Sequence, residues 1–142
     1  MIWVIDASVA VSWFLEEDNH SHADAVLRRL IDRPNSFAVP ELFCFEVFSV
    51  LCRIHPRGID AFTKGVIPLI TGGVYRRPMT ESLANRAIVY IGKGLTGYDA
   101  CYAALASELK GKWLTFDRAA HESIKKERIS HDLTEGLPDG WM

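Results

Sequence analysis

Two short strand-like segments rich in apolar residues, each followed directly by an aspartate, set the strongest limit on how this chain can fold. Residues 2–5 (IWVI) precede Asp6, and residues 112–116 (KWLTF) precede Asp117. A short, uninterrupted apolar run is typical of a strand that is buried on both faces, as in a parallel sheet. Ligands of open parallel sheets bind beyond the carboxyl ends of the strands. We therefore expect both aspartates at an edge of the sheet where a binding site can form.

Strand patterns alternate with helix patterns along the rest of the chain, which predicts an α/β domain with a mostly parallel central sheet. The expected strands cover residues 2–5, 37–39, 74–76, 112–116 and, at the sheet edge, about 129–133. The expected helices cover residues 8–15, 18–31, 40–54, 59–71, 81–92, 96–109 and 118–128. We expect Pro40 to be the first residue of its helix, Pro68 to kink or end its helix, and residues 133–142 to form an irregular tail.

Length and composition are those of one globular domain. The chain has 142 residues, of which 49% are hydrophobic and 24% are charged, so disorder is excluded as its main character. It lacks both a 20-residue apolar stretch and the basic, then apolar pattern of a signal peptide. Its three cysteines, Cys44, Cys52 and Cys101, include no C-x-x-C pair. They predict reduced core thiols in a cytoplasmic protein that does not act at a membrane.

The two aspartates have an alternative explanation, because either could simply cap the helix that follows it. Thr115 lies two residues before Asp117, on the same side of the strand, and is expected to support it. Ser8 lies two residues after Asp6 and is expected to start the next helix. Two aspartates in the same strand-end context favour a shared acidic site over two separate caps.

Glu46 lies in LFCFEVFSVLC, a predicted helix that is apolar on almost every side. Burying an ionised carboxylate without a partner costs several kcal/mol. Glu46 therefore either pairs with an arginine or faces a polar cavity and a metal ion. Glu41, on the same helix, is explained by the positive end of the helix dipole.

Asp99 also has two interpretations. Its spacing from Thr96 is that of a capping box, in which the two residues cap the helix reciprocally. The small residues over 100–106 would let that helix approach the sheet closely and bring Asp99 to the strand ends. From spacing alone, a four-acid site and four separate structural roles both stay open.

Four segments follow one another in the order and at the distances of a known family. They are VIDASVAVSWF with Asp6, VPELFCFEVFSVL with Glu46, LTGYDACYAALA with Asp99 and WLTFDRAA with Asp117. The chain thereby resembles the PIN domain family, and most closely the VapC-type toxin ribonucleases of toxin–antitoxin pairs. The resemblance covers about residues 1–133. It implies a single PIN domain over residues 1–142, built as a three-layer α/β/α sandwich.

The resemblance also implies a function. Asp6, Glu46, Asp99 and Asp117 would hold Mg²⁺ or Mn²⁺ and form the catalytic site of an endoribonuclease, with Thr115 and Ser8 as supports. The metal would polarise an RNA phosphate and activate a water. The implied partners are an RNA substrate, a cognate antitoxin and a second copy of the chain. The predicted helices 18–31 and 40–54 would form the walls of the antitoxin groove.

One departure from the family and three rival functions are to be weighed. Ser49 stands where many relatives carry an asparagine. A haloacid-dehalogenase-like phosphatase would need an aspartate where this chain has Ser8, and the acidic and phosphoacceptor residues of a receiver domain are not visible. A non-catalytic PIN-like binding module is the other alternative, although the presence of all four acids argues against a decayed site. The net charge is −2; without the four acids it would be −2 + 4 = +2, which permits a polyanionic partner.

Overall fold

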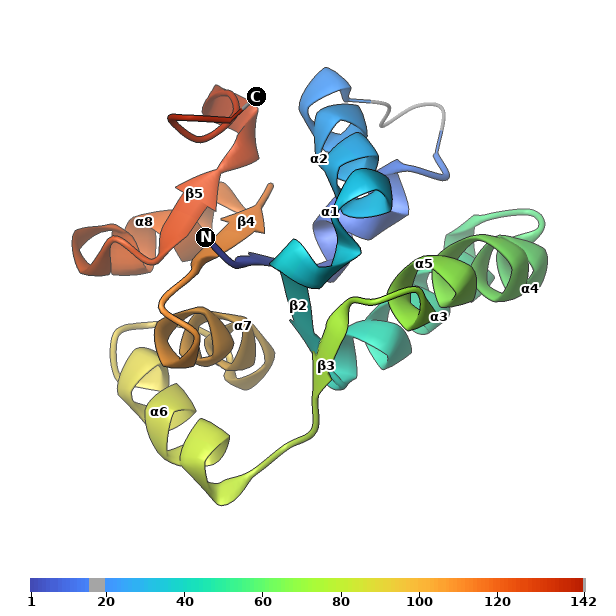
Figure 1. The fold of residues 1–142 in the computed structure, drawn as a ribbon. Helices are drawn as coiled ribbons and strands as arrows, with labels where there is room; N and C mark the ends of the chain where they lie inside the picture. Colours follow the sequence, from blue (N-terminus) through green and yellow to red (C-terminus); the bar gives the residue numbers. More distant parts are fainter. Residues whose placement is uncertain (16–19, 142) are drawn as a thin grey trace.

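The computed structural model describes residues 1–15 and 20–141 and contains a five-stranded sheet with the order β3-β2-β1-β4-β5 (Figure 1). The strands are β1 (Trp3–Ile5), β2 (Phe37–Pro40), β3 (Tyr75–Arg77), β4 (Lys112–Thr115) and β5 (Ser130–Asp132). Every neighbouring pair is parallel. The expected α/β class is confirmed, and the sheet is wholly rather than mostly parallel.

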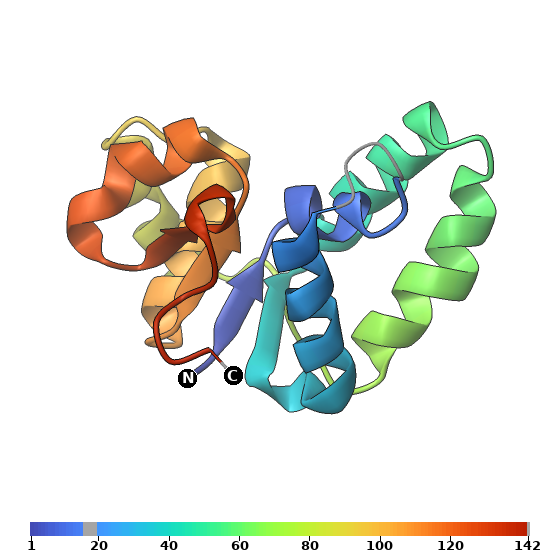
Figure 2. The same cartoon turned by 90° about the horizontal axis from the view of Figure 1, so that it is seen from above.

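Helices cover both faces of the sheet, so the domain has three layers. Five lie on one face: α1 (Ala7–Ser12), α2 (Ser21–Asp32), α3 (Leu42–Ile54), α4 (Gly58–Asp60) and α5 (Ile67–Thr71). On the other face lie α6 (Glu81–Ile91), α7 (Gly97–Glu108) and α8 (Arg118–Ile124). Figure 2 separates these two groups, blue to green on one side of the strands and yellow to orange on the other.

The central strands and α7 form the middle of the hydrophobic core. β1 and β2 are buried at every position, as the continuous apolar runs predict. α7 contacts β2, β1 and β4, and its residues 100–106 are all buried. Many of those residues are alanines, which let the helix lie close to the sheet. The first turn of α7 is thereby brought next to the carboxyl ends of the central strands.

The chain order makes the gap between β1 and β4 a topological switch point. After β1 the chain builds the sheet outward on one side through β2 and β3, and it then returns to add β4 and β5 on the other side. Crevices at such reversals, beyond the carboxyl ends of the strands, are the ligand sites of open parallel sheets. The register pairs Ile5 with Leu114, which places Asp6 beside Thr115 at this crevice.

Two proline expectations have different outcomes. Pro40 does not begin a helix; it is the last residue of β2, and α3 begins at Leu42. A proline is tolerated there because it ends the strand. Pro68 does interrupt its helix: residues Ala61–Val66 form a π-helical segment, and α5 follows with Pro68 in its first turn. Proline cannot donate the hydrogen bond that a continuous α-helix needs at this position.

Other expectations are corrected in detail. The helix expected over 8–15 ends at Ser12, and the first two residues of the one expected over 18–31 lie outside the described residues. Cys52 is exposed rather than a core thiol, and within the described residues all three cysteines are free. The C-terminal tail carries one 3₁₀ turn, Leu133–Glu135. Within residues 1–15 and 20–141 no helix is both long and apolar enough to cross a bilayer.

Candidate functional site

Asp6 is held by neutral hydrogen-bond donors at the end of β1. Its Oδ1 accepts hydrogen bonds from the backbone N–H of Ser8 at 3.0 Å and from Ser8 Oγ at 2.5 Å. Its Oδ2 accepts one from Trp113 Nε1 at 3.0 Å. Asp6, not Ser8, is the N-cap of α1, so the expectation that Ser8 starts this helix is wrong. Ser8 instead links the ends of two strands, because its Oγ also accepts from the backbone N–H of Phe116 at 3.2 Å.

The carboxyl group of Asp6 is difficult to ionise in the folded protein. Burial raises its pKa from 3.8 to about 6, and the negative charge of Asp99 adds to this rise. Hydrogen bonds from Ser8, Thr115 and Trp113 stabilise the ionised form and oppose the rise. The balance leaves a carboxylate that is positioned by donors and that forms no ion pair with any residue the structure describes.

Glu46 projects from the middle of α3 and accepts a hydrogen bond from a tyrosine in the helical layer on the other face of the sheet. Its Oε1 accepts a hydrogen bond from the hydroxyl of Tyr102, on α7, at 2.7 Å. Of the two interpretations of Glu46, the arginine pair finds no support, since no ion pair involves Glu46 within the described residues. Burial raises the pKa of Glu46, the bond from Tyr102 lowers it, and the charge of Asp99 raises it further.

Tyr102 and Trp113 connect the supports of Asp6 and Glu46. Their rings stack with centroids 6.0 Å apart and an interplanar angle of 14°, and both side chains are fully buried. Burial and the adjoining Glu46 carboxylate raise the pKa of Tyr102, so its hydroxyl stays protonated and donates. Sequence reasoning missed both residues as supports. The available signal was that buried tyrosine and tryptophan polar atoms need partners.

Replacing Tyr102 with phenylalanine should test this support directly. The ring stays in the core while Glu46 loses its donor, so the free energy of unfolding should fall by about 1 kcal/mol. Urea denaturation of the metal-free protein measures the change. Tyr90→Phe is the matched control, because Tyr90 is also a buried tyrosine but lies on α6. Equal stability of Tyr102→Phe and the parent chain would show that the hydrogen bond contributes nothing.

Asp99 lies in the first turn of α7, so it can take part both in capping the helix and in the candidate acidic site. Thr96 is the N-cap, and its Oγ1 accepts from the backbone N–H of Asp99 at 3.1 Å. Burial and the charge of Asp117 raise the pKa of Asp99, while a hydrogen bond with Thr96 lowers it. The half of the capping box that Thr96 supplies is therefore present, and the carboxylate of Asp99 still interacts with another acid.

Asp117 is the most exposed of the four acids and caps α8. Its Oδ1 accepts a hydrogen bond from the backbone N–H of Ala120 at 3.0 Å. Its own backbone N–H donates to Thr115 Oγ1 at 3.0 Å. Thr115 is fully buried and also hydrogen-bonds Asp6. It therefore stands between the two strand-end aspartates, where it positions the backbone of one and a carboxylate of the other.

Asp99 interacts electrostatically with each of the other three acids. The charge of Asp99 raises the pKa of both Asp6 and Glu46, and the charge of Asp117 raises the pKa of Asp99. Three or more carboxylates do not, however, converge tightly enough to form a preassembled metal cluster within the described residues. The donor set is all carboxylate oxygen, the chemistry preferred by Mg²⁺ and Mn²⁺, and Mg²⁺ keeps several waters that bridge loosely spaced ligands. The residues present thus fit a hydrated hard cation.

A fifth acid at the same sheet edge shows the contrast with a structural carboxylate. Asp132 ends β5 and is buried, and its Oδ1 accepts from the backbone N–H and the hydroxyl of Thr134 at 2.9 and 2.7 Å. Burial alone would raise the pKa of Asp132, but these bonds and the positive charge of Arg118 outweigh it and lower the pKa. The partners of Asp132 stabilise its ionised form and lower its pKa, whereas the pKa values of Asp6, Glu46 and Asp99 are raised.

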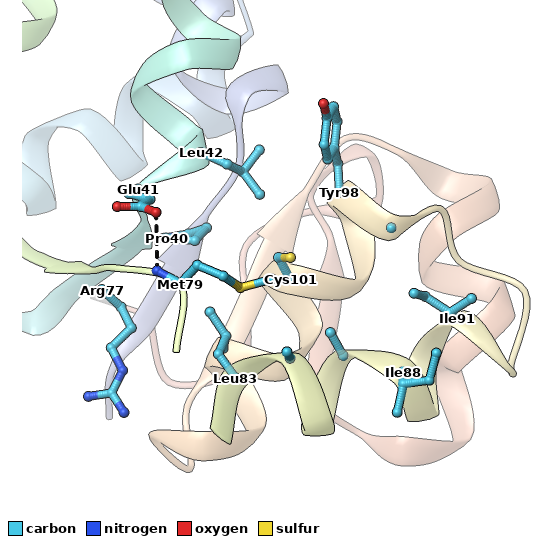
Figure 3. A pocket seen from close by; sticks show the side chains of 13 residues that line it. Pro40, Glu41, Leu42, Arg77, Met79, Leu83, Ile88, Ile91, Tyr98 and Cys101 are labelled. Atoms are coloured by element: carbon cyan, nitrogen blue, oxygen red, sulfur yellow. Dashed lines mark hydrogen bonds between the residues drawn. The ribbon is translucent and has the colours of Figure 1, made fainter. Parts of the chain in front are cut away.

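An apolar cavity of about 450 Å³ opens beside the acids, between α6, the first turn of α7 and the start of α3 (Figure 3). Leu83, Ile88 and Cys101 are among its lining residues, and none of the four candidate acids is. In Figure 3 the ring of Tyr98 stands at its rim with the hydroxyl directed away from it. This cavity is therefore a neighbour of the acidic site and not part of it.

Comparison with known proteins gives one family and a set of similar folds. The protein-family profile described as PIN domain matches residues 3–126. No curated protein sequence matches the chain at a significant level.

Three solved structures illustrate the similarity of fold. FitAcB from Neisseria gonorrhoeae aligns with a TM-score of 0.71 and 15% identity, over 96% of this chain and 100% of that one. A toxin–antitoxin complex from Klebsiella pneumoniae aligns with a TM-score of 0.66 and 14% identity, over 90% and 94% of the two chains. VapC20 of Mycobacterium tuberculosis, described as a sarcin-ricin loop cleaving toxin, gives 0.60 and 13%, over 80% and 87%. At these identities the likeness concerns the fold alone.

Proposed function

The chain belongs to the PIN domain family, and from this premise we propose that it is a metal-dependent endoribonuclease and the toxin of a toxin–antitoxin pair. The proposed site consists of Asp6, Glu46, Asp99 and Asp117. The observation that carries the proposal is the placement of these acids at the switch point between β1 and β4, where burial first and the charges of neighbouring acids second raise the pKa values of Asp6, Glu46 and Asp99. A bound cation would favour the ionised form of these carboxylates and so offset the burial and the repulsion.

Mg²⁺ or Mn²⁺ is the proposed cofactor, held by these four carboxylates. When bound, such an ion polarises a phosphate and lowers the pKa of a water for in-line attack. The chain's own residues position the ligands. Ser8 and Trp113 fix both oxygens of Asp6, Tyr102 fixes one oxygen of Glu46, and Thr115 fixes the backbone at Asp117. Pre-positioning of this kind means that few side-chain rotations are needed when substrate arrives.

Cleavage of RNA in the presence and absence of metal tests the proposal against its rivals. The purified chain should cut single-stranded RNA with millimolar Mg²⁺ or Mn²⁺ and should stop when excess EDTA is added. p-Nitrophenyl phosphate serves as the substrate for the phosphatase alternative and should not turn over. RNA binding without cleavage would instead support a non-catalytic binding module, and equal cleavage with and without EDTA would exclude a metal site.

The proposed protein partners are an antitoxin and a second copy of the chain. Support comes from the fold shared with a toxin–antitoxin complex and from apolar side chains that α3 exposes. Phe45, Phe48 and Ile54 are 71%, 43% and 47% exposed. Exposed apolar groups on one helix are typical of a surface that another protein covers. The helices α2 and α3 are the proposed walls of the antitoxin groove.

The isolated chain is therefore expected to be a dimer at tens of micromolar. Burying the exposed apolar side chains of the helical layers between two copies should favour association, because apolar burial is its main driving force. Light scattering coupled to size-exclusion chromatography measures the mass. A monomer at this concentration would contradict the homodimer and leave the antitoxin and the nuclease site to be tested separately.

A further inference from the structure

Two exposed aromatic rings flank a cavity that contains the carboxylate of Glu46. The cavity has a volume of about 480 Å³ and is lined by Leu42, Phe45, Glu46, Ser49, Val50 and Tyr98. Phe45 is 71% exposed and Tyr98 is 66% exposed. The first ring comes from α3 and the second from the first turn of α7, directly before Asp99. The cavity is therefore continuous with the proposed active site and has aromatic walls from two helices.

The rings of Phe45 and Tyr98 differ from the other aromatic side chain that α3 exposes. Phe48 packs edge-on against Phe62, with ring centroids 5.3 Å apart. Within the described residues neither Phe45 nor Tyr98 has a ring partner. Leaving large apolar rings in water has a cost that a bound flat group would remove. The cavity thus offers two unoccupied stacking faces beside a carboxylate.

A positive charge lies on the far side of Phe45. A second cavity, of about 400 Å³, is lined by Phe45, Arg76, Glu41, Cys44 and Pro78. Arg76 is exposed and forms no ion pair within the described part of the chain. Phe45 lines both cavities, so it stands between a cavity that includes Glu46 and one that includes Arg76 together with Glu41. This arrangement matches a nucleotide chain, in which phosphates alternate with bases.

We propose that the cavity between Phe45 and Tyr98 is a stacking subsite for one unpaired base of single-stranded RNA. This inference rests on the proposed nuclease function. The base next to the scissile phosphate enters the cavity, its ring stacks on these side chains, and the following phosphate lies toward Arg76. Proteins that recognise single-stranded RNA use exposed aromatic rings in this way, because splayed-out bases present a π-face.

A second copy of the chain is the competing occupant, and the neighbouring cavity fits that occupant better. The lining of the cavity in Figure 3 is mostly apolar, includes aliphatic side chains of α6 such as Leu83 and Ile88, and contains none of the four candidate acids. The Phe45–Tyr98 cavity instead includes Glu46, whose uncompensated charge disfavours an apolar protein surface. A nucleotide avoids this conflict, since its phosphate meets the cation that the carboxylates bind.

Steady-state cleavage of a short single-stranded RNA tests the subsite. Phe45→Leu and Tyr98→Leu keep apolar bulk but remove the rings, and each should raise KM about ten-fold while kcat changes less than two-fold. Tyr98→Phe keeps the ring and should recover most of the KM effect that Tyr98→Leu loses. Phe48→Leu is the matched control on the same helix and should also leave KM unchanged. Unchanged KM in both ring deletions, with a cleaving parent chain, would overturn the subsite alone.

Removing the base instead of the ring separates stacking from indirect effects. Once the cleavage position is mapped, single abasic nucleotides are placed on either side of it. One abasic position should raise the KM of the parent at least ten-fold and should raise the KM of Tyr98→Leu by a clearly smaller factor, because that variant has already lost the Tyr98 contact and keeps only the one with Phe45. If the abasic position raises KM by the same factor in the parent and in Tyr98→Leu, the stacking contact is overturned. It is also overturned if Phe45→Leu and Tyr98→Leu lose the dimer without a change in KM. A parent chain without metal-dependent cleavage would overturn both the subsite and the nuclease.

Discussion

Replacing Asp99 with asparagine is expected to lower metal-dependent RNA cleavage by at least about a thousand-fold, which corresponds to about 4 kcal/mol of activation free energy. The reason is its central position. Asp99 interacts electrostatically with Asp6, Glu46 and Asp117, so the amide weakens the cation site more than the loss of a peripheral ligand would. Initial cleavage rates of a single-stranded RNA at saturating Mg²⁺ measure the effect.

Thermal melting in EDTA supplies the control for folding. The amide removes a charge that raises the pKa of two neighbours, so metal-free Asp99→Asn should melt at or above the temperature of the parent chain. Thr96 caps α7 through the backbone N–H of residue 99, and this bond survives the substitution. Asp139→Asn, in the exposed tail, is the matched substitution that should change neither quantity. Full activity of Asp99→Asn would exclude the four-carboxylate site.

The metal-free protein should lose stability as pH rises from about 4 to about 7. Asp6 has a pKa of about 6 when folded and an ordinary value of 3.8. A folded-state pKa above the unfolded one gives a contribution to stability that is complete below pH 3.8 and disappears as pH rises through 6. The difference of about 2 pKa units is worth about 3 kcal/mol.

Urea denaturation in EDTA at several pH values, for the parent chain and for Asp6→Asn, isolates this contribution. The variant lacks the titrating group, so the difference in unfolding free energy between the two proteins should change by about 3 kcal/mol across the interval. Mg²⁺ at a hundredfold excess over its Kd should restore about 2.7 kcal/mol to the parent at neutral pH. Parallel pH profiles of the two proteins would mean that Asp6 ionises normally.

The elements that sequence periodicity predicted best are those whose local signals agree with their burial. Residues 2–5 are apolar without interruption and residues 112–116 are rich in apolar side chains, and both form central strands. Thr80, a residue type that favours helix starts, precedes α6 and caps it by accepting a hydrogen bond from the backbone N–H of Leu83 at 3.0 Å. Pro40 was misassigned because a proline suits both a helix start and a strand end. Only the pairing of Pro40 with Arg77 of β3, a contact between distant residues, decides between them.

The candidate acids could be selected from the sequence, but their supports could not. Asp6 and Asp117 are signalled by the strands before them, and Glu46 by its apolar helix. That Trp113 donates to Asp6 and Tyr102 to Glu46 depends on which side chains face each other across the sheet and α7. Spacing within one segment carries no such information. Asp132 shows the same limit, since its strand-end position alone does not reveal that Thr134 and Arg118 already satisfy it.

The stacked pair of Trp113 and Tyr102 limits how this chain could be engineered or could diverge. The two rings belong to the hydrophobic core, yet each also orients a carboxylate of the candidate site. Repacking the core around them for greater heat resistance would turn the ring planes and so move both acids together. Gains in thermal tolerance should therefore come from the exposed faces of α2 and α8, while changes at either ring should need a compensating change at the other.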